Sequence, residues 1–109
     1  MSAKHDDLVR EIRLYISEIG GLPLDTPVRH DLVNRFGRPV KIGIPGQLDL
    51  HACIKGRFVA IDAKVGRDSL GKDQRNYAHA VQTKGGIAFA AHSVDDVKNV
   101  LIAEGLVDV

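Results

Sequence analysis

The stretch that decides the fold is residues 48–64, which read LDLHACIKGRFVAIDAK. Its two halves are strand-like, and Lys55 and Gly56 between them suit a two-residue turn that joins antiparallel strands. With these two residues as the turn, Asp49 faces Asp62. The Cβ atoms of directly opposed residues lie roughly 5 Å apart on one face of a hairpin. The sequence therefore predicts two carboxylates that converge.

The two faces of this hairpin differ in chemistry, because side chains alternate along a strand. The apolar residues fall on one face, which we expect to form the core. They are Leu48, Leu50, Ala52, Val59, Ile61 and Ala63. Lys64 shares the other face with Asp62, so two acids and a lysine cluster there. The alternative is a polar outer face on which the acids pair with lysines.

The paired carboxylates predict a divalent cation. Two like charges side by side are unfavourable, and oxygen ligands of this kind suit Mg²⁺ or Mn²⁺. Such a cation would lower the pKa of a bound water and neutralise charge on a phosphoryl group, while Lys64 adds positive charge. The sequence therefore favours phosphodiester hydrolysis. A near-match to a P-loop at Gly66–Asp73 lacks the final Ser or Thr, so no nucleotide cofactor is expected.

The remaining segments predict an α/β fold. Apolar residues between Leu8 and Ile19 recur at helical spacing and are followed by Gly20-Gly21. The later segments are an edge strand over Leu22–Val28, a basic loop over His30–Arg38, the hairpin strands Leu48–Ile54 and Arg57–Lys64, a helix over Gln74–Lys84, a strand over Ile87–Ala91 and a helix capped by Ser93. This order predicts one domain over residues 1–109, with a mixed sheet flanked by helices.

Charge is unevenly spread, although the net charge of the 109 residues is +1. Arg29–Lys41 holds four basic residues and one acidic residue, and Lys55–Arg75 holds six basic and three acidic residues. Basic segments of this kind can bind phosphate backbones without reading base sequence. The expected DNA contacts are Arg29, Arg35, Arg38, Lys41, Arg67, Lys72 and Arg75.

Composition also bears on the compartment. The single cysteine, Cys53, cannot form an intramolecular disulfide, and Met1–Arg10 lacks the apolar run of a signal peptide. Every apolar stretch is much shorter than the roughly 20 residues that a membrane span needs. We expect a cytoplasmic protein with no membrane partner.

Three segments in order resemble the VRR-NUC (virus-type replication-repair nuclease) branch of the PD-(D/E)xK nuclease superfamily. They are Gly43–Asp49, Ile61–Lys64 and Gln74 before a helix, and the resemblance spans nearly the whole chain. It implies a restriction-endonuclease-like core. It also implies catalytic roles for Asp49, Asp62, Lys64 and Gln74, and a metal held by Glu11, Asp49, Asp62 and the carbonyl oxygen of Ala63. One departure is Asp62, which stands where Glu is more usual and could shift the metal.

The same resemblance implies a biological setting. Stand-alone members in phages and bacteria act as homodimers that cut branched DNA, notably four-way (Holliday) junctions, and two symmetric sites suit such a substrate. The expected cell is therefore a bacterium or a phage-infected host. Two alternatives stay open: a nuclease for flaps, nicks or ordinary duplex, and a nuclease-fold protein that binds DNA without cutting it.

Overall fold

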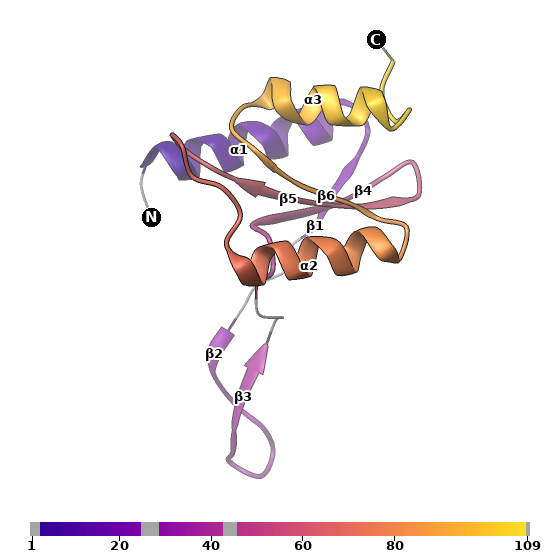
Figure 1. Ribbon diagram of the computed structural model, residues 1–109. Coiled ribbons are helices and arrows are strands. Elements are labelled where there is room, and N and C mark those ends of the chain that lie inside the picture. Colours follow the sequence, from indigo (N-terminus) through magenta and orange to yellow (C-terminus); the bar gives the residue numbers. More distant parts are fainter. Residues whose placement is uncertain (1–2, 25–28, 43–45, 109) are drawn as a thin grey trace.

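The computed structural model describes residues 3–24, 29–42 and 46–108, with the backbone alone at 29–32 and 40–42. Its elements in chain order are α1 (Ala3–Glu18), β1 (Leu22–Leu24), β2 (Arg29–Val33), β3 (Pro39–Ile42), β4 (Leu50–Ile54), β5 (Arg57–Ala63), α2 (Lys72–Thr83), β6 (Ile87–Ala91) and α3 (Val94–Ala103). The protein has the predicted α/β fold, with a four-stranded mixed sheet and three helices (Figure 1).

The predicted hairpin forms the centre of the sheet, whose strand order is β1-β4-β5-β6. Lys55 and Gly56 both have positive φ, 49° and 81°, as this type of tight turn requires. The predicted register is confirmed from the turn as far as Leu50 opposite Ile61. β6 pairs with β5 in parallel, and α2 makes the crossover between them.

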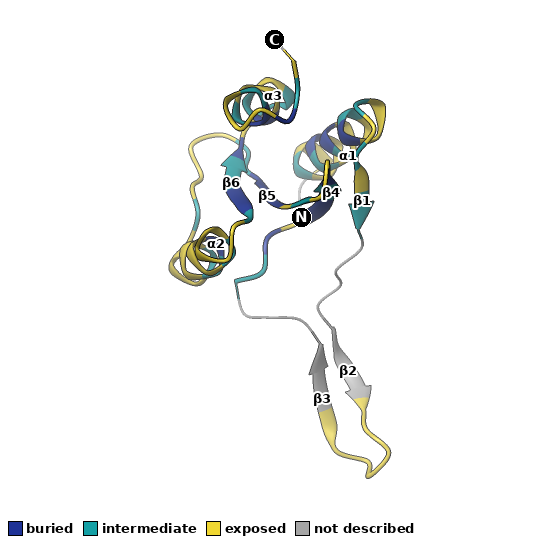
Figure 2. Cartoon of the chain, turned by 90° about the vertical axis from the view of Figure 1, so that its right-hand side faces the viewer, coloured by how far each residue is buried: buried dark blue, intermediate teal, exposed yellow. Residues whose placement is uncertain are grey.

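Helices cover both faces of the sheet (Figures 1 and 2). α1 and α3 cover one face and share with the strands the larger core. Its buried members are Leu8, Ile12, Ile16, Leu50, Ala52, Ile54, Val59, Ile61, Ala63, Ile87, Ala91, Val97, Leu101 and Leu106. α2 covers the other face, where Ala78 packs with Ala60 and Ala88 in a smaller core. Small residues on the strands let this single helix lie close to the sheet.

The sequence places only one face of the hairpin in the core, and this prediction is incomplete. α2 buries the second face as well, so that Ala60 is fully buried and Asp62 is 1% exposed. Leu48 was predicted to share a face with Leu50, but it belongs to the smaller core under α2. The reason is that β4 begins only at Leu50, so the alternation of a strand does not extend back to Leu48.

β2 and β3 form a separate antiparallel ribbon where the sequence predicts a loop over His30–Arg38. That prediction is wrong because a tight turn lies inside the segment. The Asn34 side chain accepts hydrogen bonds from the backbone N–H of Phe36 and of Arg38, at 2.9 and 3.1 Å, and Gly37 N–H donates to Asn34 O. The ribbon projects from the α2 side of the sheet (Figures 1 and 2). The radius of gyration, 14.8 Å, accordingly exceeds the about 13 Å expected of a compact chain.

Smaller features of the prediction are confirmed within the described residues. β1 is an edge strand beside β4, and the predicted extension to Val28 falls outside the described residues. α3 begins after Ser93, whose hydroxyl accepts a hydrogen bond from Asp96 N–H at 3.1 Å. None of the helices that the structure describes is long and apolar enough to cross a membrane.

Candidate active site

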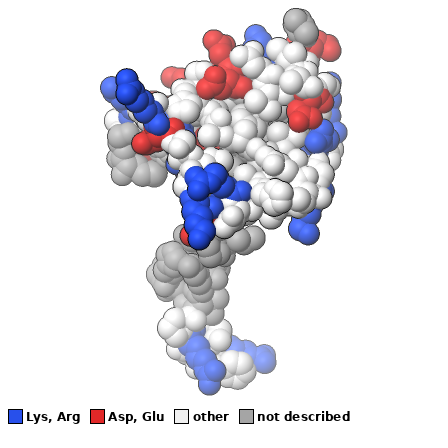
Figure 3. Space-filling view, viewed as in Figure 1, with Lys and Arg blue, Asp and Glu red and all other residues white. Residues whose placement is uncertain are grey.

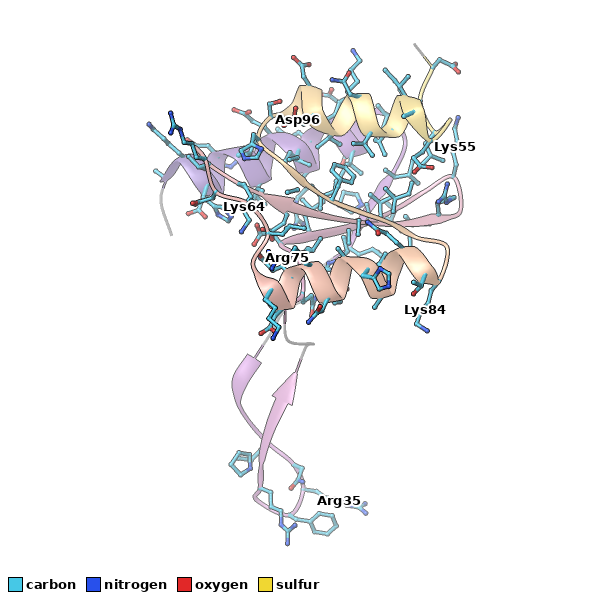
Figure 4. All side chains as sticks on the ribbon, viewed as in Figure 1. Arg35, Lys55, Lys64, Arg75, Lys84 and Asp96 are labelled. Atoms are coloured by element: carbon cyan, nitrogen blue, oxygen red, sulfur yellow. The ribbon has the colours of Figure 1, made fainter. Side chains whose placement is uncertain are left out.

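The predicted site residues meet at one end of the sheet. Asp62 ends β5 together with Ala63, Lys64 follows directly, and Asp49 immediately precedes β4. The first turn of α2 brings Gln74 to the same end. In Figure 4, Lys64 lies between the first turns of α1 and α2. Ligands commonly bind at the carboxyl ends of strands in α/β sheets, where the following loop opens the structure.

Asp62 is the buried centre of this site. Its Oδ2 accepts from Lys64 Nζ at 2.8 Å and from Gln74 Nε2 at 3.1 Å, and its Oδ1 accepts from the backbone N–H of Asp49 at 3.1 Å. Burial raises the pKa of the Asp62 carboxyl, and the charge of Asp49 raises it further, against the lowering effect of Lys64. The protein therefore holds an acid where its charge is costly, with donors on both oxygens.

Gln74 connects α2 to the hairpin. Its Oε1 accepts from Lys64 Nζ at 3.1 Å and from Gly71 N–H at 3.0 Å, while its Nε2 donates to Asp62. The Gly71 contact is half of a capping box, because glycine has no side chain to return the bond. The oxygen of the Gln74 amide thus accepts from the ammonium of Lys64 while its nitrogen donates to the carboxylate of Asp62. These two hydrogen bonds fix the geometry of the Asp62 and Lys64 pair.

Asp49 is the more open acid, with 30% of its side chain exposed. It does not extend β4 opposite Asp62 as a further strand pair, because the chain bends at this residue. Instead the two acids bond reciprocally: Asp49 N–H donates to Asp62, and Asp49 Oδ2 accepts from Ala63 N–H at 3.1 Å. The predicted proximity of the two acids is confirmed by these bonds, although its geometry differs from that of a strand pair.

Sequence reasoning missed His5 in α1. Its Nε2 lies 2.9 Å from Asp49 Oδ2. Burial lowers the pKa of His5, but the hydrogen bonds and charges of Asp49 and Asp6 outweigh burial and leave the pKa raised. Leu8 and Ile12 follow His5 at helical spacing on the buried face of α1, which was the available signal.

Glu11, the residue predicted from α1, is exposed and lies about 120° around the helix from His5. The structure does not gather Glu11, Asp49 and Asp62: among the described residues, no three His, Cys, Asp or Glu side chains form a group that could hold a metal. The carbonyl of Ala63 and the carboxylate of Glu11 keep their predicted metal-binding roles only as predictions.

His51, which follows Asp49 by two residues, is buried under α2 away from solvent. Its Nε2 lies 2.7 Å from the hydroxyl of Tyr77, and the two rings meet edge to face at 5.8 Å. Burial lowers the pKa of His51 and raises that of Tyr77. This pair stabilises the contact between α2 and the sheet, in keeping with a structural role for His51.

The predicted DNA contacts fall into two groups. Arg67, Lys72 and Arg75 are exposed in the loop after β5 and in the first turn of α2, next to Gln74. Arg35 and Arg38 are exposed at the tip of the ribbon, and the side chains of Arg29 and Lys41 lie outside the described residues. Figure 3 shows Lys and Arg over the start of α2 and at the ribbon tip, whereas acidic side chains gather around α3.

No protein-family model matches the sequence, and no curated protein matches it. The functional assignment therefore depends on the geometry of the site and on the order of its motifs.

Proposed function

We propose that this protein is a divalent-metal-dependent endodeoxyribonuclease with a restriction-endonuclease-like core. The observation that carries the proposal is the buried Asp62, bonded to Lys64 and Gln74 and joined to the half-exposed Asp49 by reciprocal hydrogen bonds. A fold that keeps two acids and an ammonium together at an open strand end maintains a costly arrangement, and such arrangements are typical of active sites.

The donor set fits Mg²⁺ or Mn²⁺. These ions take one or two carboxylates together with waters and substrate phosphate, and they favour oxygen ligands. Asp49 and Asp62 would hold the ion, with the carbonyl oxygen of Ala63 as a third ligand. When bound, the ion supplies a water of lowered pKa and neutralises charge on the phosphoryl oxygens.

Lys64 would bind the scissile phosphate. An ammonium has three N–H donors, and two of them already bond to Asp62 and Gln74. The third is left for a phosphate oxygen, where it stabilises the charge that develops in the transition state. Attack of water on phosphorus breaks the bond to the 3′ oxygen, which takes up a proton, leaving 5′-phosphate and 3′-hydroxyl ends.

Gln74 and His5 would position the groups that act. Gln74 holds Lys64 and Asp62 at a fixed separation, and His5 orients Asp49 from the other side. Arg67, Lys72 and Arg75, which are exposed in the loop after β5 and in the first turn of α2, would contact the flanking backbone phosphates.

Branched DNA is the proposed substrate, cut by a homodimer in the manner of a Holliday-junction resolvase, on the basis of the VRR-NUC resemblance. Two symmetric sites suit a symmetric junction. The runner-up is a nuclease for flaps, nicks or duplex. A non-catalytic DNA-binding protein is the alternative from another class, favoured by the lack of a third acid among the described residues near the pair.

The test is a cleavage panel of four-way junction, flap, nicked and duplex DNA, with Mg²⁺ or with EDTA. We expect the junction to be cut only with Mg²⁺. Lys64→Met should lower the rate about 100-fold or more, as removal of one charge-stabilising donor does in other enzymes. Asp62→Asn, which keeps the size of the side chain, should abolish cutting.

Matched controls come from the opposite end of the sheet, where Glu104 after α3 and Lys84 after α2 are exposed. Glu104→Gln and Lys84→Met should cut at the wild-type rate. Mg²⁺ should also raise the melting temperature of the wild type but not of Asp62→Asn, since a ligand stabilises the state that binds it. If the wild type binds junctions tightly and cuts no member of the panel with either metal, the non-catalytic alternative replaces this proposal.

A further inference from the structure

The ribbon of β2 and β3 presents an uncovered aromatic side chain at its far end. Phe36 is 73% exposed, the largest value among the exposed large apolar residues of the described chain, and Val33, three residues earlier in the same ribbon, is 64% exposed. Every described side chain from Val33 to Pro39 is exposed, and Figure 2 shows this tip far from the body of the protein. A large apolar ring held in water away from any core marks a binding surface.

The turn holds Phe36 in a defined position. Asn34 Oδ1 accepts hydrogen bonds from the N–H groups of Phe36 and Arg38, and Asn34 N–H donates to Arg38 O at 2.8 Å. Gly37, with φ of +77°, closes the turn through its N–H to Asn34 O. The tip is thus a preformed turn, and the entropy cost of ordering it is not paid when a ligand binds.

The charge around Phe36 identifies the ligand. Arg35 and Arg38 lie on either side of Phe36 in the sequence, the Arg35 guanidinium carbon is 4.9 Å from the centroid of the ring, and residues 33–39 contain no acid. Arginine beside an aromatic ring matches a nucleic-acid strand, whose phosphates bind the guanidinium and whose bases stack on the ring. A hydrophobic partner surface would gain nothing from this charge.

The shape of the ribbon agrees with this ligand. A two-stranded ribbon is narrow enough to enter the major groove of duplex DNA. The described part of the protein measures 52 Å along its long axis, and in Figure 4 Arg75 lies between Lys64 and the ribbon tip with its Arg35. DNA at the candidate active site could therefore continue toward the tip.

We propose that the ribbon tip is a nucleic-acid-binding site in which Phe36 stacks on an unpaired or unstacked base while Arg35 and Arg38 bind the neighbouring phosphates. The inference deepens the proposed function, since it assigns to the same DNA a contact remote from the cutting site. It also gives a reason for preferring branched DNA, because stacking on a base inside a duplex requires unstacking it at a cost in free energy, and this cost is smallest for a base that is already unpaired.

The test measures binding separately from cutting, in EDTA, by fluorescence anisotropy with three labelled probes: oligothymidylate, a four-way junction and a plain duplex. Phe36→Ala should weaken binding to oligothymidylate and to the junction about 5- to 150-fold, the range for loss of one stacked base, and should change duplex binding little. Phe36→Trp should restore the affinity, whereas Phe36→Leu, which keeps apolar bulk without an aromatic ring, should not.

The arginines are tested through salt dependence. Arg35→Ala and Arg38→Ala should each reduce the slope of log affinity against log salt by about 0.7 for the single strand, because each removes one phosphate contact. Lys84→Ala is the matched control, since Lys84 is exposed at the other end of α2, far from the ribbon in Figure 4. It should leave the slope unchanged.

A base analogue reports stacking directly. With 2-aminopurine at the branch point, wild-type protein should change the fluorescence and Phe36→Ala should not. Wild-type affinity and wild-type 2-aminopurine response in Phe36→Ala would overturn the inference, even if the protein cuts DNA. Loss of self-association in Phe36→Ala with DNA binding intact would overturn it in favour of a contact between two copies. Conversely, stacking through Phe36 without cleavage by the wild type would leave the inference standing and remove the proposed nuclease.

Discussion

Replacing Gly46 with alanine should damage both stability and the candidate site. Gly46 has φ of +79° and lies where the chain approaches Asp49. A Cβ on this residue would collide with the carbonyl group of Asp73 and lie 2.8 Å from the backbone nitrogen of Gln74. These atoms belong to the first turn of α2, so they cannot move without moving the amide of Gln74 as well.

The cost has two parts. The left-handed backbone costs a side chain about 1–2 kcal/mol, and forcing packed backbone apart costs typically about 1–3 kcal/mol more. Alanine regains about 0.4–1 kcal/mol because it restricts the unfolded chain. The expected net loss is about 1–4.6 kcal/mol, which at its upper end is a large share of the roughly 5–15 kcal/mol by which domains are usually stable.

Gly85→Ala is the matched control for this variant. Gly85 follows α2, has φ of +90°, and would place its Cβ in open space. Gly85→Ala therefore has the cost of the left-handed backbone without the collision, and should lose about 0–1.6 kcal/mol of stability. Urea unfolding followed by circular dichroism gives both values, and nuclease assays should show Gly46→Ala impaired beyond Gly85→Ala. Equal losses of stability in the two variants would refute the close approach of Gly46 to the first turn of α2.

Three further predictions concern buried groups. Burial lowers the pKa of His51 below its ordinary value of 6.5. Between 6.5 and the pKa in the folded protein, the unfolded chain therefore binds a proton at His51 that the folded protein does not, and the free energy of unfolding falls as the pH falls. In His51→Gln the slope of unfolding free energy against pH in that window should be smaller by up to about 1.4 kcal/mol per unit, and an unchanged slope would contradict the burial of a neutral ring. Tyr77→Phe should cost about 1–3 kcal/mol by chemical denaturation, whereas Tyr15→Phe should be neutral or stabilising, because the buried Tyr15 hydroxyl has no hydrogen-bond partner among the described residues. Ile61→Ala should cost about 2–5 kcal/mol in thermal melts, against less than about 0.5 kcal/mol for Leu14→Ala on the exposed side of α1; similar costs would argue against the described core.

The hairpin was predictable because its rules are local. A two-residue turn fixes the register, and alternation fixes the faces, so the proximity of Asp49 and Asp62 followed from counting residues from Lys55 and Gly56. The limit came where the strand ended. At Asp49 the chain bends, and side-chain bonds take over from strand pairing, which no pattern of alternation describes.

Contacts between distant elements were not predictable in this way. The choice between His5 and Glu11 depends on how α1 is rotated and shifted against the sheet, which packing of Leu8 and Ile12 decides. The coverage of Ala60 by α2 depends likewise on the path of the crossover. The ribbon was missed because its turn, built on Asn34, lies inside a segment whose arginines and glycine suggested a loop.

The reciprocal bonds at the open end of the hairpin make each acid part of the backbone scaffold. Beyond the last backbone pair of β4 and β5, the carboxylates of Asp62 and Asp49 each accept a hydrogen bond from a backbone N–H of the other segment. A cation that binds these carboxylate oxygens competes with those two hydrogen bonds. Occupancy of the site and fraying of the strand ends are therefore thermodynamically linked, and amide hydrogen exchange at Asp49 and Ala63 would register a bound ion before any DNA is cut.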